Sequence, residues 1–163
     1  MNQILSVETA FMTDDRDTER GRPMKPLRPE ILSDIKMPVA KLIGFEITEV
    51  STGRAVTSLQ TGPQHANPMG TLHGGILCDI CDAAMGISLA TTLEDDQSFT
   101  TMELKINFFR PVWTSKLTAE ATVIQRGKTT AYVECTVTHE NNKLVAKASS
   151  TCMILNGQRA QGR

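Results

Sequence analysis

HANPMGTLHGGILCDICD, residues 65–82, is the stretch in which a polar loop becomes a helix. Pro68 and Gly70 interrupt its first half, whereas the apolar residues after Gly75 recur at helical spacing. This change predicts a helix that begins near His73 and runs to about residue 92. The first turn of such a helix carries free backbone N–H groups and a partial positive charge, which suit an oxyanion or a polarised carbonyl. Its glycines would let a ligand approach those groups closely.

The predicted helix is apolar on both sides. At about 100° per residue, one stripe contains four apolar residues, which are Ile76, Ile80, Ala83 and Ile87. Asp82 lies on the far side, together with Cys78, Met85 and Leu89. A helix that is apolar all round is usually buried, so we expect something to cover this far side. A carboxylate under such a cover is paired, shifted in pKa or available to a substrate.

The separation of Gly74 and Asp82 predicts an oligomer. Eight residues span about 12 Å along a helix, at about 1.5 Å per residue. Two groups that act on one carbonyl must each lie about 3 Å from it. If both residues serve one reaction, they therefore come from different subunits. Two such helices running antiparallel across a two-fold axis would form a dimer with two shared sites.

The composition excludes several classes of protein. The chain has 163 residues, with 17 basic and 18 acidic side chains, which argues against nucleic-acid binding. No apolar run approaches the roughly 18 residues of a membrane span, and no signal peptide is evident, so we expect a soluble, cytoplasmic protein. The pair Cys78-x-x-Cys81 lacks a second pair at zinc-ribbon spacing. We therefore predict free thiols and neither a metal site nor a cofactor.

The flanking residues divide the chain into three parts. Residues 1–28 are polar and charged and predict a flexible arm, residues 29–156 the folded domain, and residues 157–163 a polar tail. The start of the domain, residues 30–42, is weakly helical and interrupted by Pro38. Alternation and turn residues predict strands over 43–50, 54–61, 99–110, 116–126, 130–139 and 143–155.

Strict alternation in residues 99–110 assigns each side chain to a face. The residues expected to face the helix are Thr100, Met102, Leu104, Ile106 and Phe108. Thr101 is expected to face away. Two strands, one long helix and four further strands predict an α+β domain with an antiparallel sheet of about six strands.

The chain carries a series of motifs over residues 38–155. They are Gly44-Phe45, Gly53-Arg54-Ala55, Asn67-Pro68-x-Gly70-x-x-His73-Gly74-Gly75 with Asp82, and Phe109-Arg110-Pro111. In combination they resemble the hotdog-fold acyl-CoA thioesterases of the phenylacetate-pathway type. The resemblance implies a long helix wrapped by a curved antiparallel sheet, with two subunits sharing each active site.

The resemblance also implies roles for individual residues. Asp82 matches the catalytic carboxylate, as base or nucleophile, and Gly74 the residue whose N–H polarises the thioester carbonyl. Asn67 and His73 match loop positions that place the carbonyl or the water, and Thr101 matches a Ser or Thr near the carboxylate. Substrate binding is implied for three residues, Gly75, Arg126 and Lys128, the last two in a turn near the CoA phosphates. Asp79 is a second acid that could take the role of Asp82.

The expected activity is hydrolysis of acyl-CoA to free acid and CoA by a homodimer or a tetramer (a dimer of dimers). Two alternatives stay open, namely a hotdog enoyl hydratase or dehydratase and a non-catalytic acyl-CoA-binding or regulatory protein. Each residue also has an ordinary interpretation. Asp82 could be a paired interface acid, His73 a brace of the helix start, and Arg126 with Lys128 a solvated pair.

Overall fold

The computed structural model describes residues 37–161. Its helices are α1 (Pro38–Ile43) and α2 (Gly74–Ala90), with two short 3-10 helices, η3 (Pro63–His65) and η4 (Gly157–Ala160). Its strands are β1 (Phe45–Ser51), β2 (Arg54–Gln60), β3 (Gln97–Phe108), β4 (Lys116–Arg126), β5 (Thr130–His139) and β6 (Leu144–Asn156). The arm predicted over residues 1–28 lies outside the described residues.

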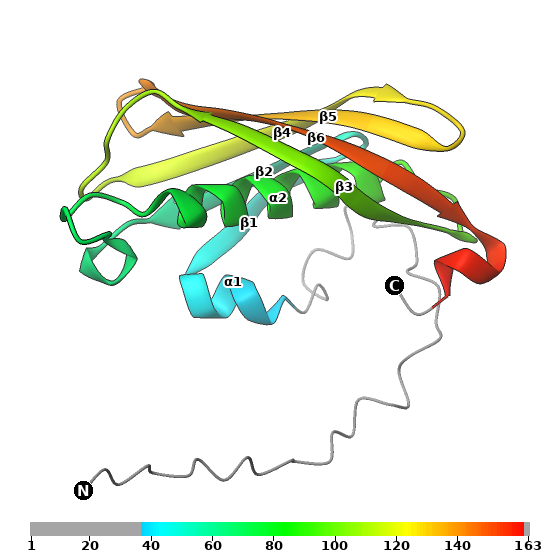
Figure 1. Ribbon diagram of the computed structural model, residues 1–163, viewed down its shortest axis with the longest axis horizontal. Helices are drawn as coiled ribbons and strands as arrows, with labels where there is room; N and C mark the ends of the chain where they lie inside the picture. The colour runs from blue at the N-terminus through cyan, green and yellow to red at the C-terminus, as the bar shows by residue number, and fades with distance from the viewer. Residues whose placement is uncertain (1–36, 162–163) are drawn as a thin grey trace, which may run out of the picture.

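One six-stranded antiparallel sheet curves around α2 (Figure 1), with strand order β1-β2-β4-β5-β6-β3. The long helix packs mainly against β2 and β4 in the middle of the sheet. The predicted α+β architecture is therefore confirmed, and the predicted ranges of β4 and β5 match the observed strands at both ends.

The buried side of α2 is rotated by about one residue from the stripe predicted from the sequence, which was Ile76, Ile80, Ala83 and Ile87. Its fully buried side chains include Ile80, Cys81, Ala84, Met85 and Leu89. Ile80 was predicted correctly, but Ile76 and Ala83 are only partly buried. Met85 and Leu89, predicted beside Asp82, lie in the core instead. Each large apolar side chain buried in this way contributes about 1.5–3 kcal/mol to folding.

A bulge in β3 changes which side chains face the helix. Thr101 pairs with Cys152 and Glu103 with Thr151, so Met102 is the extra residue between them. Leu104 and Ile106 pack on the core as predicted. Before the bulge the alternation is reversed, because a bulge adds one residue to one strand only. The prediction that Thr101 faces away from the helix, and Met102 toward it, is therefore wrong.

Helix α1 also differs from the prediction. Pro38 is the first residue of this helix, where the N–H that proline lacks has no partner in any case, and residues 30–36 of the predicted segment lie outside the described residues. Ile43 ends the helix and is not the first residue of a strand. Gly44 then adopts φ +88°, the left-handed conformation that glycine tolerates, and the chain enters β1.

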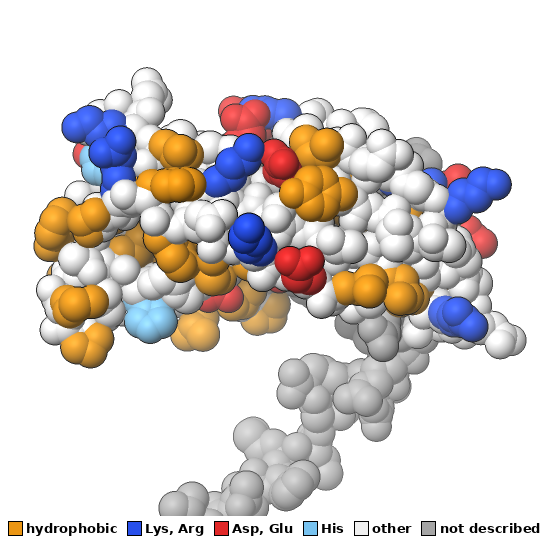
Figure 2. All heavy atoms as spheres, turned by 45° about the horizontal axis from the view of Figure 1, so that its top comes forward, with side chains coloured by type: hydrophobic (Ala, Val, Ile, Leu, Met, Phe, Trp, Pro, Cys, Tyr) orange, Lys and Arg blue, Asp and Glu red, His pale blue; other side chains and the backbone are white. Residues whose placement is uncertain are grey.

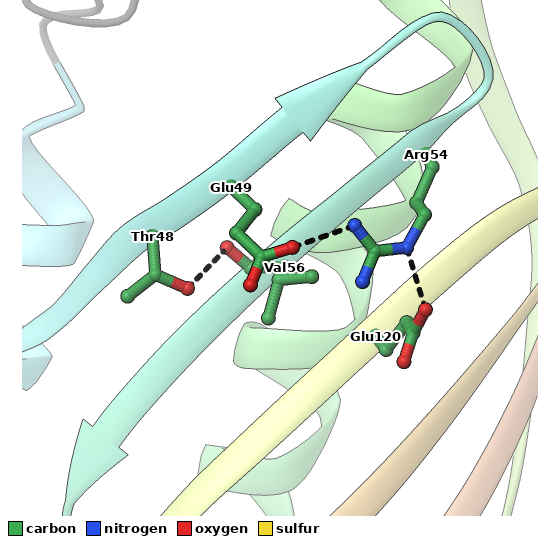
Figure 3. Close-up of polar contacts among 5 residues, drawn as sticks. All are labelled: Thr48, Glu49, Arg54, Val56 and Glu120. Atoms are coloured by element: carbon green, nitrogen blue, oxygen red, sulfur yellow. Dashed lines mark hydrogen bonds and ion pairs between the residues drawn. The ribbon is translucent and has the colours of Figure 1, made fainter.

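Arg54 joins three strands at the β1 side of the sheet (Figure 3). Its Nη1 lies 2.7 Å from Glu49 Oε2 on β1, and its Nε lies 2.6 Å from Glu120 Oε1 on β4. The hydrogen bonds that Arg54 donates to the Glu49 and Glu120 carboxylates raise the pKa of its guanidinium. Because the side chains are exposed, each pair stabilises the fold only slightly, by about 0–1 kcal/mol.

The outward side of the domain mixes side chains of every kind. Figure 2 shows hydrophobic groups separated by basic and acidic side chains over the face that it presents. Among residues 37–161, no helix is long and apolar enough to cross a membrane.

Candidate active site

The first turn of α2 leaves one backbone N–H available. His73 caps the helix, as the predicted start requires, and its Nδ1 accepts the N–H of Gly75 at 2.9 Å. The N–H of Ile76 binds the His73 carbonyl oxygen at 3.1 Å. Among the described residues, the N–H of Gly74 has no acceptor. This donor also carries the partial positive charge of the helix start.

A cavity of about 350 Å³ opens beside Gly74. It is bounded by the start of α2, by the last residue of β3 (Phe108) and by residues 109–112, which follow that strand. The Phe108 ring lies so close that a Cβ added to Gly74 would be 3.1 Å from Phe108 Cζ. Glycine thus leaves space between this aromatic ring and the backbone, and the free N–H can reach a group held in the cavity.

Asp82 lies two turns further along α2, on the side that faces away from the core. In the single chain it is exposed. Thr101 Oγ1 lies 3.5 Å from Asp82 Oδ1, a long hydrogen bond that the bulge in β3 makes possible. Partial desolvation raises the pKa of the Asp82 carboxyl, the bond from Thr101 lowers it, and the charge of Asp79 raises it further. The result is a carboxylate more basic than usual, at an accessible position.

Asp79 is the weaker candidate for the same role. It is exposed on α2, one turn before Asp82. Thr101 donates to Asp82, whereas the part of the chain that the structure describes offers no such partner to Asp79. The geometry therefore favours Asp82.

Asn67 organises the loop that precedes α2. Its Oδ1 accepts the backbone N–H groups of Met69 at 2.9 Å and Thr71 at 3.3 Å, and its Nδ2 donates to Thr71 Oγ1 at 2.9 Å. The side chain of Asn67 thus braces the backbone before Gly74, and that of His73 braces the backbone after it. These contacts fit a role in placing the loop.

Arg126 and Lys128 do not lie beside Gly74 in the same chain. Arg126 Nη2 donates to Gln97 Oε1 at 2.5 Å, at the start of β3. Its buried Nε has no partner among residues 37–161. Because β3 runs from Gln97 to Phe108, this turn and the start of α2 occupy opposite ends of the sheet, as Figure 1 shows.

A second cavity, of about 340 Å³, adjoins the first one and was not foreseen from the sequence. Both are lined by residues 110–112. The second one adds Trp113, His139 and Lys143, so it is basic and partly aromatic. Arg110 Nε donates to the Leu144 carbonyl oxygen at 3.0 Å, which holds the guanidinium at the junction. The turn at Asn141 and Asn142, recognised in the sequence, is what brings Lys143 here.

The cysteines are free thiols. Three of them are buried, Cys81, Cys135 and Cys152, and Cys78 is partly exposed. Desolvation raises the pKa of Cys78. No group of three potential metal ligands occurs among the described residues.

Comparison with known proteins places this arrangement in a family. Residues 69–146 match the model of the Thioesterase superfamily. The 1,4-dihydroxy-2-naphthoyl-CoA hydrolase of Listeria monocytogenes is 30% identical over 118 residues, covering 72% of this chain and 96% of that protein. Mouse acyl-coenzyme A thioesterase 13 is 25% identical over 129 residues, covering 74% and 91%.

A solved structure shows the same fold. The Escherichia coli PaaI protein from the phenylacetic acid degradation operon superposes with a TM-score of 0.72, covering 80% of this chain and 93% of that one at 24% identity. The fold and the family expected from the motifs are both confirmed. The chain belongs to the thioesterase superfamily, as a thioester hydrolase with the hotdog fold.

Proposed function

We propose that the chain hydrolyses acyl-CoA thioesters with Asp82 as base or nucleophile and with Gly74 N–H as the carbonyl-polarising donor. The observation that carries this proposal is the free N–H of Gly74 beside the cavity. Asp82, more basic than usual and bonded to Thr101, is the second part. Asn67, His73 and Gly75 hold the backbone around the donor.

The chemistry needs these two groups and a water molecule. With Asp82 as base, the carboxylate takes a proton from water as the water oxygen bonds to the thioester carbon. The carbonyl oxygen becomes an oxyanion that accepts the hydrogen bond of Gly74 N–H. When the intermediate collapses, the C–S bond breaks, CoA leaves as a thiolate and takes up a proton. With Asp82 as nucleophile, a carboxylate oxygen bonds to the thioester carbon, the C–S bond breaks to release the CoA thiolate, and water then hydrolyses the resulting anhydride.

Two subunits are needed to bring the groups together. α2 is one continuous helix, so Gly74 and Asp82 lie about 12 Å apart along its axis within a chain. β3 is 12 residues long and ends the sheet, which leaves one side of its backbone unpaired within the described residues. Long exposed edges favour pairing with another strand. We therefore propose a two-fold dimer in which β3 pairs with its copy and Gly74 approaches Asp82 of the partner subunit.

The nucleotide end of CoA has two candidate places. Resemblance to the family implies Arg126 and Lys128, in the turn between β4 and β5. An antiparallel dimer would bring this turn of one subunit toward the start of α2 in the other. The basic cavity at Arg110 and Lys143 shares the lining residues 110–112 with the Gly74 cavity in the same chain. Cations in either place would attract the phosphates.

A panel of acyl-CoA substrates assayed with a thiol reagent tests the function. We expect release of free CoA, with a blank containing only protein because four cysteines can react. Asp82→Asn should abolish release, and the matched variant Asp79→Asn should retain it. Hydration of an enoyl-CoA without thiol release would support a hydratase. Binding without any reaction would support a regulatory protein, and either result refutes the proposal.

Size-exclusion chromatography with light scattering tests the shared site. We expect the active species to be a dimer or a dimer of dimers. An active monomer would refute the two-subunit arrangement while leaving the hydrolase assignment intact.

A further inference from the structure

His65 is a buried histidine at the meeting point of three segments. It is 5% exposed and ends η3. Its Nδ1 accepts the N–H of Gly62 at 3.1 Å, and its Nε2 lies 2.7 Å from the carbonyl oxygen of Ile43 at the end of α1. Because Nδ1 accepts a hydrogen bond, the ring proton is on Nε2, which donates to Ile43. Both ring nitrogens are thus engaged in one neutral tautomer.

The backbone of His65 extends this connection to the start of α2. Its carbonyl oxygen accepts the N–H of His73 at 2.8 Å. Ala66 and Leu72 form an isolated β-bridge beside that bond. His73 in turn accepts the N–H of Gly75 through Nδ1, which leaves Gly74 as the free donor. A displacement of residue 65 would therefore move the cap of α2 and change the direction of the Gly74 N–H.

We propose that His65 is a positioning residue that aims the Gly74 N–H at the thioester carbonyl. Its ring fixes residue 65 between the end of α1 and the start of η3, and its carbonyl oxygen fixes His73. This inference rests on the proposed function, in which the Gly74 N–H binds the carbonyl oxygen. An apolar side chain of similar size could fill the space, but it would leave the N–H of Gly62 and the carbonyl of Ile43 without their partner.

Three substitutions separate the two ring contacts. His65→Leu removes both, His65→Gln keeps a donor near the place of Nε2, and His65→Asn keeps an acceptor near the place of Nδ1. Val133→Ala is the control, because Val133 is fully buried on β5 and takes no part in these hydrogen bonds. It should lower the melting temperature without touching the start of α2.

We expect His65→Leu to lower kcat by about 10- to 100-fold with KM within about threefold, because a misplacement of about 1 Å can cost about 100-fold in rate. His65→Gln and His65→Asn should each recover part of the loss. Val133→Ala should keep the kcat of the unsubstituted chain despite its lower melting temperature. A merely structural role for His65 would make kcat follow stability in all four variants.

Amide NMR signals report the same link without turnover. The signals of Gly74 and Gly75 should shift in His65→Leu and stay in place in Val133→Ala. Unchanged kcat and unchanged glycine signals in His65→Leu overturn the inference. If His65→Leu does not fold, unchanged kcat in both His65→Gln and His65→Asn overturns it equally. If the unsubstituted chain hydrolyses no thioester, the proposed function fails, and the glycine signals still decide whether His65 sets the start of α2.

Discussion

Gly74→Pro removes one hydrogen-bond donor, the backbone N–H of residue 74, from the candidate site. Gly74 is the first residue of α2, where the backbone N–H has no partner within the helix and where proline is favoured. A residue before proline must be extended, and His73 already has φ −67° and ψ 132°. The substitution thus deletes the N–H proposed to bind the carbonyl oxygen while keeping the helix start.

The size of the effect follows from the contacts in the first turn. The N–H groups of Gly75 and Ile76 are taken by His73, so no neighbouring donor replaces the lost one. Loss of one such donor costs about 100- to 1000-fold in kcat, or about 2.7–4 kcal/mol of transition-state stabilisation. Any new Cβ also displaces the half-exposed Phe108 ring, which it would approach to 3.1 Å.

Gly74→Ala is the matched control because it adds the same Cβ and keeps the N–H. We expect Gly74→Pro to have a kcat about 100-fold below that of Gly74→Ala for acyl-CoA, measured by thiol release. The free energies of unfolding of the two variants should agree within about 1 kcal/mol, the range of a proline substitution that fits its site. Equal kcat values would show that the Gly74 N–H does not act on the carbonyl.

Four other substitutions test the rest of the site. Asp82→Asn should abolish turnover without lowering the melting temperature at pH 7. A carboxyl whose pKa is raised on folding lowers the stability of the fold at any pH at which it is ionised, so its removal should not destabilise the chain. A clearly lower melting temperature would contradict this. Thr101→Val should move the acidic limb of the kcat/KM profile to higher pH, since the bond from Thr101 lowers the pKa of Asp82, and an unmoved limb would argue against Asp82 as the base. Lys143→Glu should raise KM for acyl-CoA about fivefold, the equivalent of about 1 kcal/mol for an exposed ion pair, and leave KM for acyl-pantetheine unchanged. If Lys128→Glu has that effect instead, the phosphates lie at the β4–β5 turn.

The sequence predicts the fold well because the elements obey simple rules. β5 alternates throughout and β4 alternates as far as Val123, both are bounded by turn residues, and their ends were predicted without error. α2 was located by the glycine pair and the apolar run that follows it. The pattern could not fix the rotation of α2, because a helix that is apolar on nearly every side allows several stripes. Packing against β2 and β4 decided that question.

The candidate site was harder to predict because it depends on departures from those rules. A period of two places Thr101 away from the helix, and only the extra residue Met102 turns it toward Asp82. Nothing in the residue types around position 102 marks a bulge. The basic cavity likewise joins the connection between β3 and β4 with β5, β6 and the turn between them, and these segments are adjacent only after the sheet has formed.

The bulge and the unpaired edge of β3 both affect the surroundings of Asp82. Bulges are common beside active sites because they redirect a side chain without ending the strand. Here Thr101 lies on β3, the strand that ends the sheet, and its side chain contacts the Asp82 carboxylate, which is exposed in the single chain. A permanent cation beside this acid would lower its pKa, and full solvation would leave the pKa at its ordinary value. In the dimer proposed above, a second subunit would cover Asp82 and add to the desolvation that already raises its pKa in the single chain. Assembly and catalysis would then depend on the same surface, so a substitution that prevents pairing along β3 should abolish turnover even when each chain folds.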